Sequence, residues 1–222
     1  MVHFVGAGSG AKDLITVRGM NLLKNADVII YAGSLVNPEL LEYAEDSCEI
    51  YNSAYMTLEE IIDVIKTADS ENKDIVRLHT GDSSIYGAIR EQIEELAKYG
   101  ITCEICPGVS SFLAAAAAVK CEYTVPDVAQ TVIITRMPGR TPVPDNESIA
   151  KLAQHGTSMA VFLSSSHLEE LKEELYKDFN LYRCDDIESL ITEYVKYYNT
   201  ERPSTKCGRK SPVQFKTEQG FA

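Results

Sequence analysis

The sequence predicts an α/β protein built on mostly parallel sheets. Short runs of β-branched residues alternate with longer amphipathic stretches, which is the pattern of strand–helix–strand units. Glycine-rich turns follow several of the strand-like runs. Because the helices that connect parallel strands pack on the sheet, helices are expected on both of its faces. A length of 222 residues suits one large domain or two small ones.

The first 121 residues are expected to form an N-terminal α/β domain. Pro38 begins a short helix, because the first helical turn needs no N–H at that position. Thr57 and Glu60 form a capping box for the next helix, and Gly100 ends a later one. Strands are expected at residues 2–5, 28–31, 49–51, 75–78 and 101–105, and helices at 14–24, from 38, and at 57–70, 85–98 and 110–119.

A second α/β region is expected at residues 122–182. It opens with a linker at 122–130 that contains Pro126. Strands are expected at 131–135 and 159–163, and helices at 148–154 and 168–177. Residues 183–222 are treated as a separate tail.

The charge and composition exclude several classes of protein. The chain has 21 basic and 33 acidic residues, a net charge of −12, so it is a poor general binder of nucleic-acid phosphate. Its apolar runs are too short for a membrane span, and no signal peptide is recognisable. The six cysteines are then expected to be reduced thiols. We therefore expect a globular cytoplasmic protein that binds neither membranes nor nucleic acid.

Three loops that follow predicted strands are candidates for a ligand site. Their residues are 6–10, 80–87 and 107–111. In open parallel sheets ligands bind outside the carboxyl ends of the strands, so these loops would face one cleft. Each loop also has a simpler interpretation: the glycines at 6–10 could form only a tight turn, and Asp82 or the hydroxyls at 110–111 could only cap helices. The spacing Gly6-x-Gly8-x-Gly10 fits neither the usual dinucleotide fingerprint nor an ATP-binding loop.

Other chemistry finds little support in the sequence. The four histidines show no zinc-binding spacing, and no nucleophile elbow is present, so no metal is expected. Cys103 and Cys106 have the spacing of a redox or metal half-site but lack a second pair. Arg136 and Arg140 flank a Pro-Gly turn, where they either bind a carboxylate-rich ligand or lie on a solvated loop.

Taken together, these loops resemble the tetrapyrrole (corrin/porphyrin) methyltransferases that use S-adenosylmethionine. The resemblance covers about residues 1–180, and serine stands at positions 9 and 83, where proline is usual in the family. The segments at 32–36 and 140–144 point more narrowly to members that methylate C-11 of precorrin-4 or cobalt-precorrin-4 in cobalamin biosynthesis. The matching segments are Val5-Gly6-Ala7-Gly8-Ser9-Gly10, Ala32-Gly33-Ser34-Leu35-Val36, Thr80-Gly81-Asp82-Ser83-Ser84-Ile85-Tyr86-Gly87, Pro107-Gly108-Val109-Ser110-Ser111 and Gly139-Arg140-Thr141-Pro142-Val143-Pro144.

The resemblance implies a fold, a cofactor and a set of site residues. The fold would be two α/β domains in a homodimer, and the product of the cofactor would be S-adenosylhomocysteine. Cofactor contacts carry over to Thr80, Gly81, Asp82, Ile85, Ser110, Ser111 and Leu163. Residues expected on the side of the tetrapyrrole substrate are Gly8, Ser9, Ser34, Arg136 and Arg140.

The catalytic residue cannot be assigned from the sequence. Methyl transfer from a sulfonium to an electron-rich ring carbon depends on in-line positioning more than on a strong nucleophile. No general base is identified. A polycarboxylate substrate requires local cations on an acidic protein, and Arg136 and Arg140 are the candidates.

The tail departs from the family pattern at about residue 183. Tyr198-Asn199-Thr200-Glu201-Arg202 and Ser211-Pro212-Val213-Gln214-Phe215 resemble the C-terminus of insertion-sequence transposases. Residues 200–217 carry a net charge of +4. We therefore interpret the second domain as truncated and the tail as foreign. The alternative for the tail is a divergent C-terminal helix followed by a disordered basic end. The alternatives to an active C-11 methyltransferase are an inactive remnant and a related enzyme that acts at another carbon.

Overall fold

The structure, a computed structural model, describes residues 1–33, 35–139, 141–164, 168 and 171. Contacts divide the chain into two compact units, of which the first is Met1–Ala115 and the second begins at Ala116. The sequence placed the domain boundary at residue 121. The division by contacts falls a few residues earlier, inside helix α4 (Ser111–Ala118), and the predicted domain bounds stay a prediction.

The first unit is a five-stranded sheet in which all neighbouring strands are parallel, as the sequence predicts. The strand order is β3-β2-β4-β1-β5. The strands are β1 (Val2–Gly6), β2 (Val28–Tyr31), β3 (Glu49–Asn52), β4 (Ile75–His79) and β5 (Cys103–Cys106). Strands β1 and β4 therefore each have a neighbouring strand along both edges.

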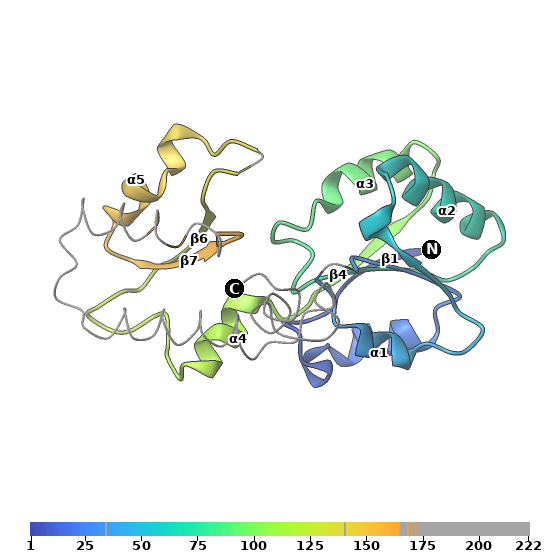
Figure 1. The fold of residues 1–222 in the computed structure, drawn as a ribbon, viewed down its shortest axis with the longest axis horizontal. Coiled ribbons are helices and arrows are strands. Elements are labelled where there is room, and N and C mark those ends of the chain that lie inside the picture. Colours follow the sequence, from blue (N-terminus) through green and yellow to red (C-terminus); the bar gives the residue numbers. More distant parts are fainter. Residues whose placement is uncertain (34, 140, 165–167, 169–170, 172–222) are drawn as a thin grey trace, which may run out of the picture. The chain divides into compact units, whose positions relative to one another are not determined.

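Helices cover both faces of this sheet (Figure 1). Helix α1 (Val17–Lys24) lies on one face, and α2 (Leu58–Ser70) and α3 (Ile89–Ala97) lie on the other. Three short 3-10 helices complete the connections: η1 (Lys12–Leu14), η2 (Pro38–Tyr43) and η3 (Ser53–Tyr55). The predicted capping box of α2 is present, with Thr57 and Glu60 bonded to each other's backbone N–H.

Two helices begin later than the sequence predicts. The first was expected from residue 14, but α1 begins at Val17 because the Thr16 hydroxyl accepts a hydrogen bond from Gly19 N–H and caps it there. The other was expected from residue 85, but α3 begins at Ile89. The preceding segment cannot be helical, since Tyr86 and Ala88 have φ angles of 54° and 50°.

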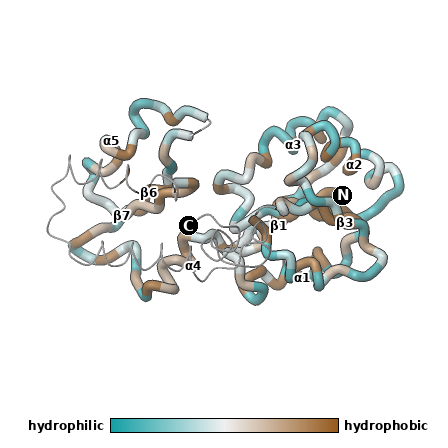
Figure 2. Tube along the Cα trace, in the orientation of Figure 1, coloured by the Kyte–Doolittle hydropathy of each residue, from teal (hydrophilic) through white to brown (hydrophobic). Residues whose placement is uncertain are grey.

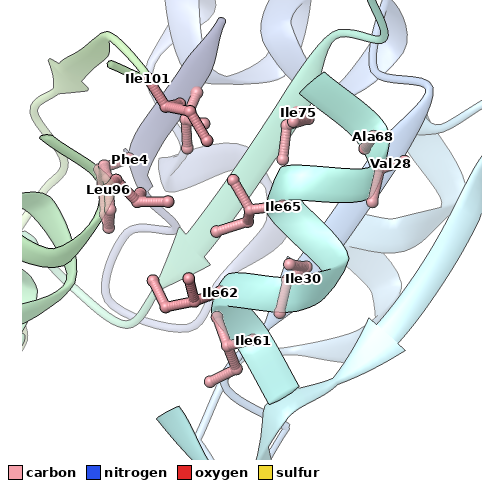
Figure 3. Close-up of a cluster of buried hydrophobic side chains, with 11 residues drawn as sticks. Phe4, Val28, Ile30, Ile61, Ile62, Ile65, Ala68, Ile75, Leu96 and Ile101 are labelled. Atoms are coloured by element: carbon pink, nitrogen blue, oxygen red, sulfur yellow. The ribbon is translucent and has the colours of Figure 1, made fainter. Parts of the chain in front are cut away.

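The alternation of side chains along each strand builds two cores, one on each face of the sheet. Phe4 and Ile30 belong to the core under α2 and α3, whereas Val5 and Ile29 belong to the core under α1. Figure 3 shows Ile61, Ile62 and Ile65 of α2 packed over the strands in the first of these cores. Figure 2 shows the hydropathy along the chain, with strands mostly hydrophobic and connecting loops mostly hydrophilic.

The second unit contains a two-stranded parallel sheet. Its strands are β6 (Val132–Arg136) and β7 (Ser158–Phe162), connected through η4 (Asp145–Glu147) and α5 (Ile149–Ala153). These elements match the predicted strands and helix to within one residue at each end. Except for residues 168 and 171, the predicted helix at 168–177 lies outside the described residues, as does the tail at 183–222. Of the described helices, none is long and apolar enough to cross a membrane.

Candidate functional site

The candidate site in the first unit lies at the carboxyl ends of β1 and β4. The connection from β1 to β2 crosses over β4, which lies between them in the sheet. The connection from β4 to β5 crosses over β1. The two connections leave in opposite directions along the sheet. A parallel sheet binds its ligands at such a reversal of strand order.

The loops after β1 and β4 are joined directly by their backbones. Gly8 N–H donates to Gly81 O at 3.2 Å, and Gly81 N–H donates to Gly8 O at 2.9 Å. Both residues have positive φ angles, 79° and 59°, which explains why glycine stands at each position. A Cβ at Gly108, in the loop after β5, would lie 2.1 Å from Gly81 O. The three glycine-containing loops therefore meet at one point, as the sequence analysis expected.

Asp82 fastens the loop after β5 to the loop after β4. One carboxylate oxygen accepts from Gly108 N–H at 2.8 Å, and the other accepts from Ser84 N–H at 2.9 Å and from the Ser84 hydroxyl. Burial raises the pKa of Asp82, but the hydrogen bonds from Ser84 and Gly108 together lower it below its ordinary value. The carboxylate is thus ionised and occupied by protein donors.

The predicted cofactor residues of this unit surround the same point. A Cβ at Gly81 would lie 3.6 Å from the Cα of Ser110 and 3.7 Å from the backbone N of Ser111. Thr80 leads from β4 into Gly81, and Ile85 lies in the turn that follows, with its N–H donated to Asp82 O at 3.2 Å. Ser110 is buried, whereas Ser111 is exposed at the start of α4.

The turn between Asp82 and α3 is held in an uncommon backbone conformation. Besides the positive φ angles of Tyr86 and Ala88, a Cβ at Gly87 would lie 2.1 Å from Ser83 O. Such conformations cost on the order of 1–3 kcal/mol each and are concentrated in binding and catalytic loops. This strain is an observation, independent of any sequence motif, that favours a functional role for residues 83–88.

Three buried polar atoms near these strand ends have no hydrogen-bond partner among the described residues. They are Ser9 Oγ, His79 Nε2 and Ser83 Oγ. Burial lowers the pKa of His79 to about 3, with a smaller contribution from the positive charge of Arg77. His79 is therefore a neutral imidazole, packed on the Phe4 ring with a centroid separation of 5.8 Å.

Asn37 is a residue of this edge that sequence reasoning missed. Its Nδ2 donates to Gly10 O at 2.8 Å, and its Oδ1 accepts from Glu39 N–H at 3.1 Å at the start of η2. The N-cap role could have been foreseen from an asparagine directly before Pro38. Nothing in the sequence pointed to its contact with the glycine loop.

The second unit places Arg136 at the end of β6, where its guanidinium is taken up by its own loop. Nη1 donates to Met137 O and Thr141 O at 3.2 and 3.1 Å, and Nη2 donates to the Thr141 hydroxyl and Pro142 O at 2.9 and 3.0 Å. The sequence analysis expected a cation that binds substrate carboxylates. In the structure the Arg136 guanidinium holds the backbone of Met137, Thr141 and Pro142, and its role toward substrate stays a prediction. Arg140 and Ser34 lie outside the described residues.

Leu163 follows β7 with its side chain 69% exposed and a φ angle of 55°. A leucine in the left-handed region is uncommon and strained. Next to it, Ser164 is buried and accepts a hydrogen bond from Met137 N–H at 3.1 Å, which links the ends of β6 and β7. An exposed, strained hydrophobic residue at a strand end is consistent with a ligand contact.

The Cys103–Cys106 pair does not form a two-thiol site. Cys103 packs against the core under α2 and α3, whereas Cys106 belongs to the core under α1. Three residues apart on a strand, the two side chains point to opposite faces of the sheet. Among the described residues, no three His, Cys, Asp or Glu side chains are grouped so that they could hold a metal ion.

Comparison with known proteins defines the class. A family model of tetrapyrrole (corrin/porphyrin) methylases matches residues 1–194, and the chain belongs to this family. The cobalt-precorrin-4 C(11)-methyltransferase of Methanocaldococcus jannaschii is 59% identical over 174 residues, which cover 78% of this chain and 67% of that protein. The precorrin-4 C(11)-methyltransferase of Pseudomonas aeruginosa is 45% identical over 174 residues, which cover 78% of this chain and 69% of that protein.

Solved structures show the same fold. The X-ray structure of a cobalt precorrin-4 methyltransferase matches with a TM-score of 0.77 and 45% identity, covering 80% of this chain and 74% of that one. A uroporphyrin-III C-methyltransferase from Thermus thermophilus, solved with S-adenosylhomocysteine, matches with a TM-score of 0.59 and 24% identity. At that identity the second match shows only the fold.

Proposed function

We propose that this chain is an S-adenosylmethionine-dependent methyltransferase that methylates C-11 of precorrin-4 or cobalt-precorrin-4 in cobalamin biosynthesis. The observation that carries this proposal is the 59% identity with the enzyme of Methanocaldococcus jannaschii across 174 residues. A related enzyme acting at another carbon is less well supported. The uroporphyrinogen-III C-methyltransferase of Bacillus subtilis is 40% identical over 121 residues, which cover 52% of this chain.

The proposed cofactor residues are Thr80, Gly81, Asp82, Ile85, Ser110, Ser111 and Leu163. Their fit to S-adenosylmethionine is supported by the joined loops at the strand ends, where backbone groups of Gly81 and Ser110 lie close together. The exposed, strained Leu163 offers an apolar contact. Asp82 differs from the others, because its carboxylate already accepts three hydrogen bonds from the protein.

The proposed residues on the tetrapyrrole side are Gly8, Ser9, Ser34, Arg136 and Arg140. Of these, Ser9 carries a buried hydroxyl without a partner among the described residues, which leaves it free to bond to a ligand. Arg136 supports this role indirectly, through the loop that it holds. Arg140, which lies outside the described residues, is proposed as the second cation for a polycarboxylate.

The chemistry asks for positioning rather than for an acid or a base. S-adenosylmethionine supplies, when bound, an electrophilic methyl group on a sulfonium. The protein holds the cofactor and the tetrapyrrole so that the methyl group and the ring carbon are aligned. Such positioning can lower the barrier by several kcal/mol. Interlocked loops suit this task because their backbone groups cannot move independently of one another.

We also propose that the protein works as a homodimer in the cytoplasm. The family resemblance supports the dimer, and the free thiols of Cys48, Cys103, Cys106 and Cys121 support a reducing compartment. Sedimentation equilibrium of the purified chain tests the oligomeric state. A monomer at micromolar concentration contradicts the dimer.

The cofactor assignment is tested by calorimetric titration with S-adenosylhomocysteine. We expect one site per chain, and at least tenfold weaker binding in Asp82→Ala, which frees the loop after β5. Asp63→Ala is the matched control, because it removes an exposed carboxylate of α2 paired only with Lys66. No binding by a chain that is folded by circular dichroism overturns the proposal and favours an inactive remnant.

The reaction itself is tested with precorrin-4 and cobalt-precorrin-4 as substrates. We expect a mass increase of one methyl group, and carbon NMR with labelled S-adenosylmethionine should place that group at C-11. A product labelled at another ring carbon identifies a related enzyme instead.

A further inference from the structure

The side chain of Asn37 connects two segments that leave the sheet from different strands. Gly10 belongs to the loop after β1, and Asn37 belongs to the segment after β2. In the sheet β4 lies between these two strands, so the contact spans a non-adjacent pair. The Asn37 Nδ2 links the two segments by donating to Gly10 O, while its Oδ1 accepts from Glu39 N–H within its own segment.

The glycine loop has few other means of staying in place at its outer end. Gly10 has a φ angle of 123°, and a Cβ built there would meet nothing within 4 Å. Its inner end is fixed by the Gly8–Gly81 bridge. The Asn37 contact is therefore the described hydrogen bond that holds the carbonyl at Gly10, two residues beyond that bridge and directly after Ser9.

We propose that Asn37 is a positioning residue for the tetrapyrrole: by holding Gly10 it sets the orientation of Ser9 and Gly8 toward the substrate. This inference rests on the proposed function, which assigns Gly8 and Ser9 to the substrate side. Asn37 itself touches no reacting atom. Its effect falls on substrate binding, because Gly10 lies beyond the Gly8–Gly81 bridge, whereas the cofactor loops stay joined by that bridge and by the bond between Asp82 and Gly108.

The amide can be tested without losing the cap of η2. Asp is as good an N-cap residue as Asn, so Asn37→Asp keeps the bond from Glu39 N–H. It cannot donate to Gly10 O, and it places a carboxylate against that carbonyl. Thr57→Asp is the matched control, because it puts the same carboxylate at another N-cap, that of α2, with no contact to the glycine loop.

Two readouts on the full chain decide the proposal. We expect Asn37→Asp to raise the KM for cobalt-precorrin-4 about tenfold, with the Kd for S-adenosylhomocysteine unchanged. The Tm should fall by only about 2–4 °C, because the folded chain loses one hydrogen bond. Hydrogen exchange of the peptide covering residues 6–14 should become faster. Thr57→Asp should leave every value as in the unmodified chain.

Each other outcome has a defined meaning. Unchanged exchange in residues 6–14 overturns the proposal, because the contact then does not hold the loop. Faster exchange with unchanged KM also overturns it, since the loop is then irrelevant to the substrate. Equal losses of cofactor and substrate affinity indicate general damage and contradict the assigned role. Failure of the unmodified chain to bind or methylate any corrin precursor overturns both this proposal and the proposed function, whereas faster exchange in that case shows that the contact itself exists.

Discussion

His79 ends β4 with its imidazole buried against Phe4, and its pKa is lowered to about 3 by burial and by the nearby charge of Arg77. An unfolded histidine binds a proton below a pH of about 6.5, whereas His79 in the folded chain does not. The unfolded state then binds more protons, so stability falls as pH decreases from 6.5 toward 3. We expect a loss approaching 1.4 kcal/mol for each pH unit in this window.

Urea unfolding at pH 6.5, 5.5 and 4.5 measures this dependence. His79→Phe keeps a ring on Phe4 but removes the titrating group, so its stability should vary less over the same range. Replacing the exposed His155 by Gln serves as the control. The lowered pKa of Asp82 affects stability only at more acidic pH, below its ordinary value of 3.8. An equal slope in the chain with and without His79 contradicts the prediction.

Leu163 combines a strained backbone conformation with an exposed apolar side chain. Leu163→Gly relieves a left-handed conformation that costs about 1–2 kcal/mol, partly offset by the greater entropy of unfolded glycine. We expect a stability equal to or slightly above that of the unmodified chain, together with weaker binding of S-adenosylhomocysteine. The control is Asp127→Gly, which relieves a φ of 60° elsewhere in the second unit and should leave affinity unchanged. Unchanged affinity in Leu163→Gly would remove this residue from the cofactor site.

Residue roles were the part of the site that the sequence predicted least well. The motifs predicted that the loops containing Gly81, Asp82 and Ser110 lie close together, and in the structure these loops are in contact. The use of each side chain depends on partners distant in the chain. Asp82 bonds to Gly108, and Asn37 bonds to Gly10, across 26 and 27 positions. Spacing along one strand cannot reveal such contacts.

At the scale of elements, a buried polar link ties β4 to α3. Arg77 Nε donates to Gln92 Oε1 at 3.0 Å, and its Nη1 donates to Ile30 O at 3.1 Å. Burial lowers the pKa of Arg77 to about 10. Removing one partner leaves Arg77 Nε or Gln92 Oε1 buried without its hydrogen bond, which is costlier than removing both.

This coupling predicts the behaviour of a double-mutant cycle. Arg77→Met and Gln92→Met should each cost about 2–4 kcal/mol in the free energy of unfolding. The double variant should cost less than the sum by about 1 kcal/mol, since neither Arg77 Nε nor Gln92 Oε1 is then left buried without its partner. Arg90→Met, on the exposed side of α3, is the control and should have little effect. Strict additivity in urea unfolding rules out the link as a coupled pair.

Element boundaries were predictable where local capping determines them and not where tertiary strain does. The Thr57 box and the strands of both units follow directly from the sequence pattern. Residues 85–88 have a helical pattern but do not form a helix, because the turn packs closely on Ser83 and takes positive φ angles at Tyr86 and Ala88. The helical propensity of residues 85–88 is therefore overridden by the packing of the loops at the strand ends.

For the whole molecule, the net charge of −12 acts on an acidic substrate before any contact forms. A polycarboxylate tetrapyrrole is repelled at long range, and salt screens this repulsion as the Debye length falls from about 30 Å at 0.01 M to about 8 Å at 0.15 M. The proposed close contacts with Arg136 and Arg140 would be screened less. We therefore expect the KM for the tetrapyrrole to decrease over this range of ionic strength.

The cofactor provides the internal comparison for this experiment. S-adenosylmethionine carries a positive sulfonium, so added salt should leave its KM unchanged or raise it slightly. Steady-state kinetics with each substrate varied in turn, at fixed pH and in a chloride salt, separates the two responses. A KM for the tetrapyrrole that increases with salt means that local cations, and not the overall charge, govern its approach. That result would indicate that the loop held by Arg136 contributes more to substrate binding than the overall charge does.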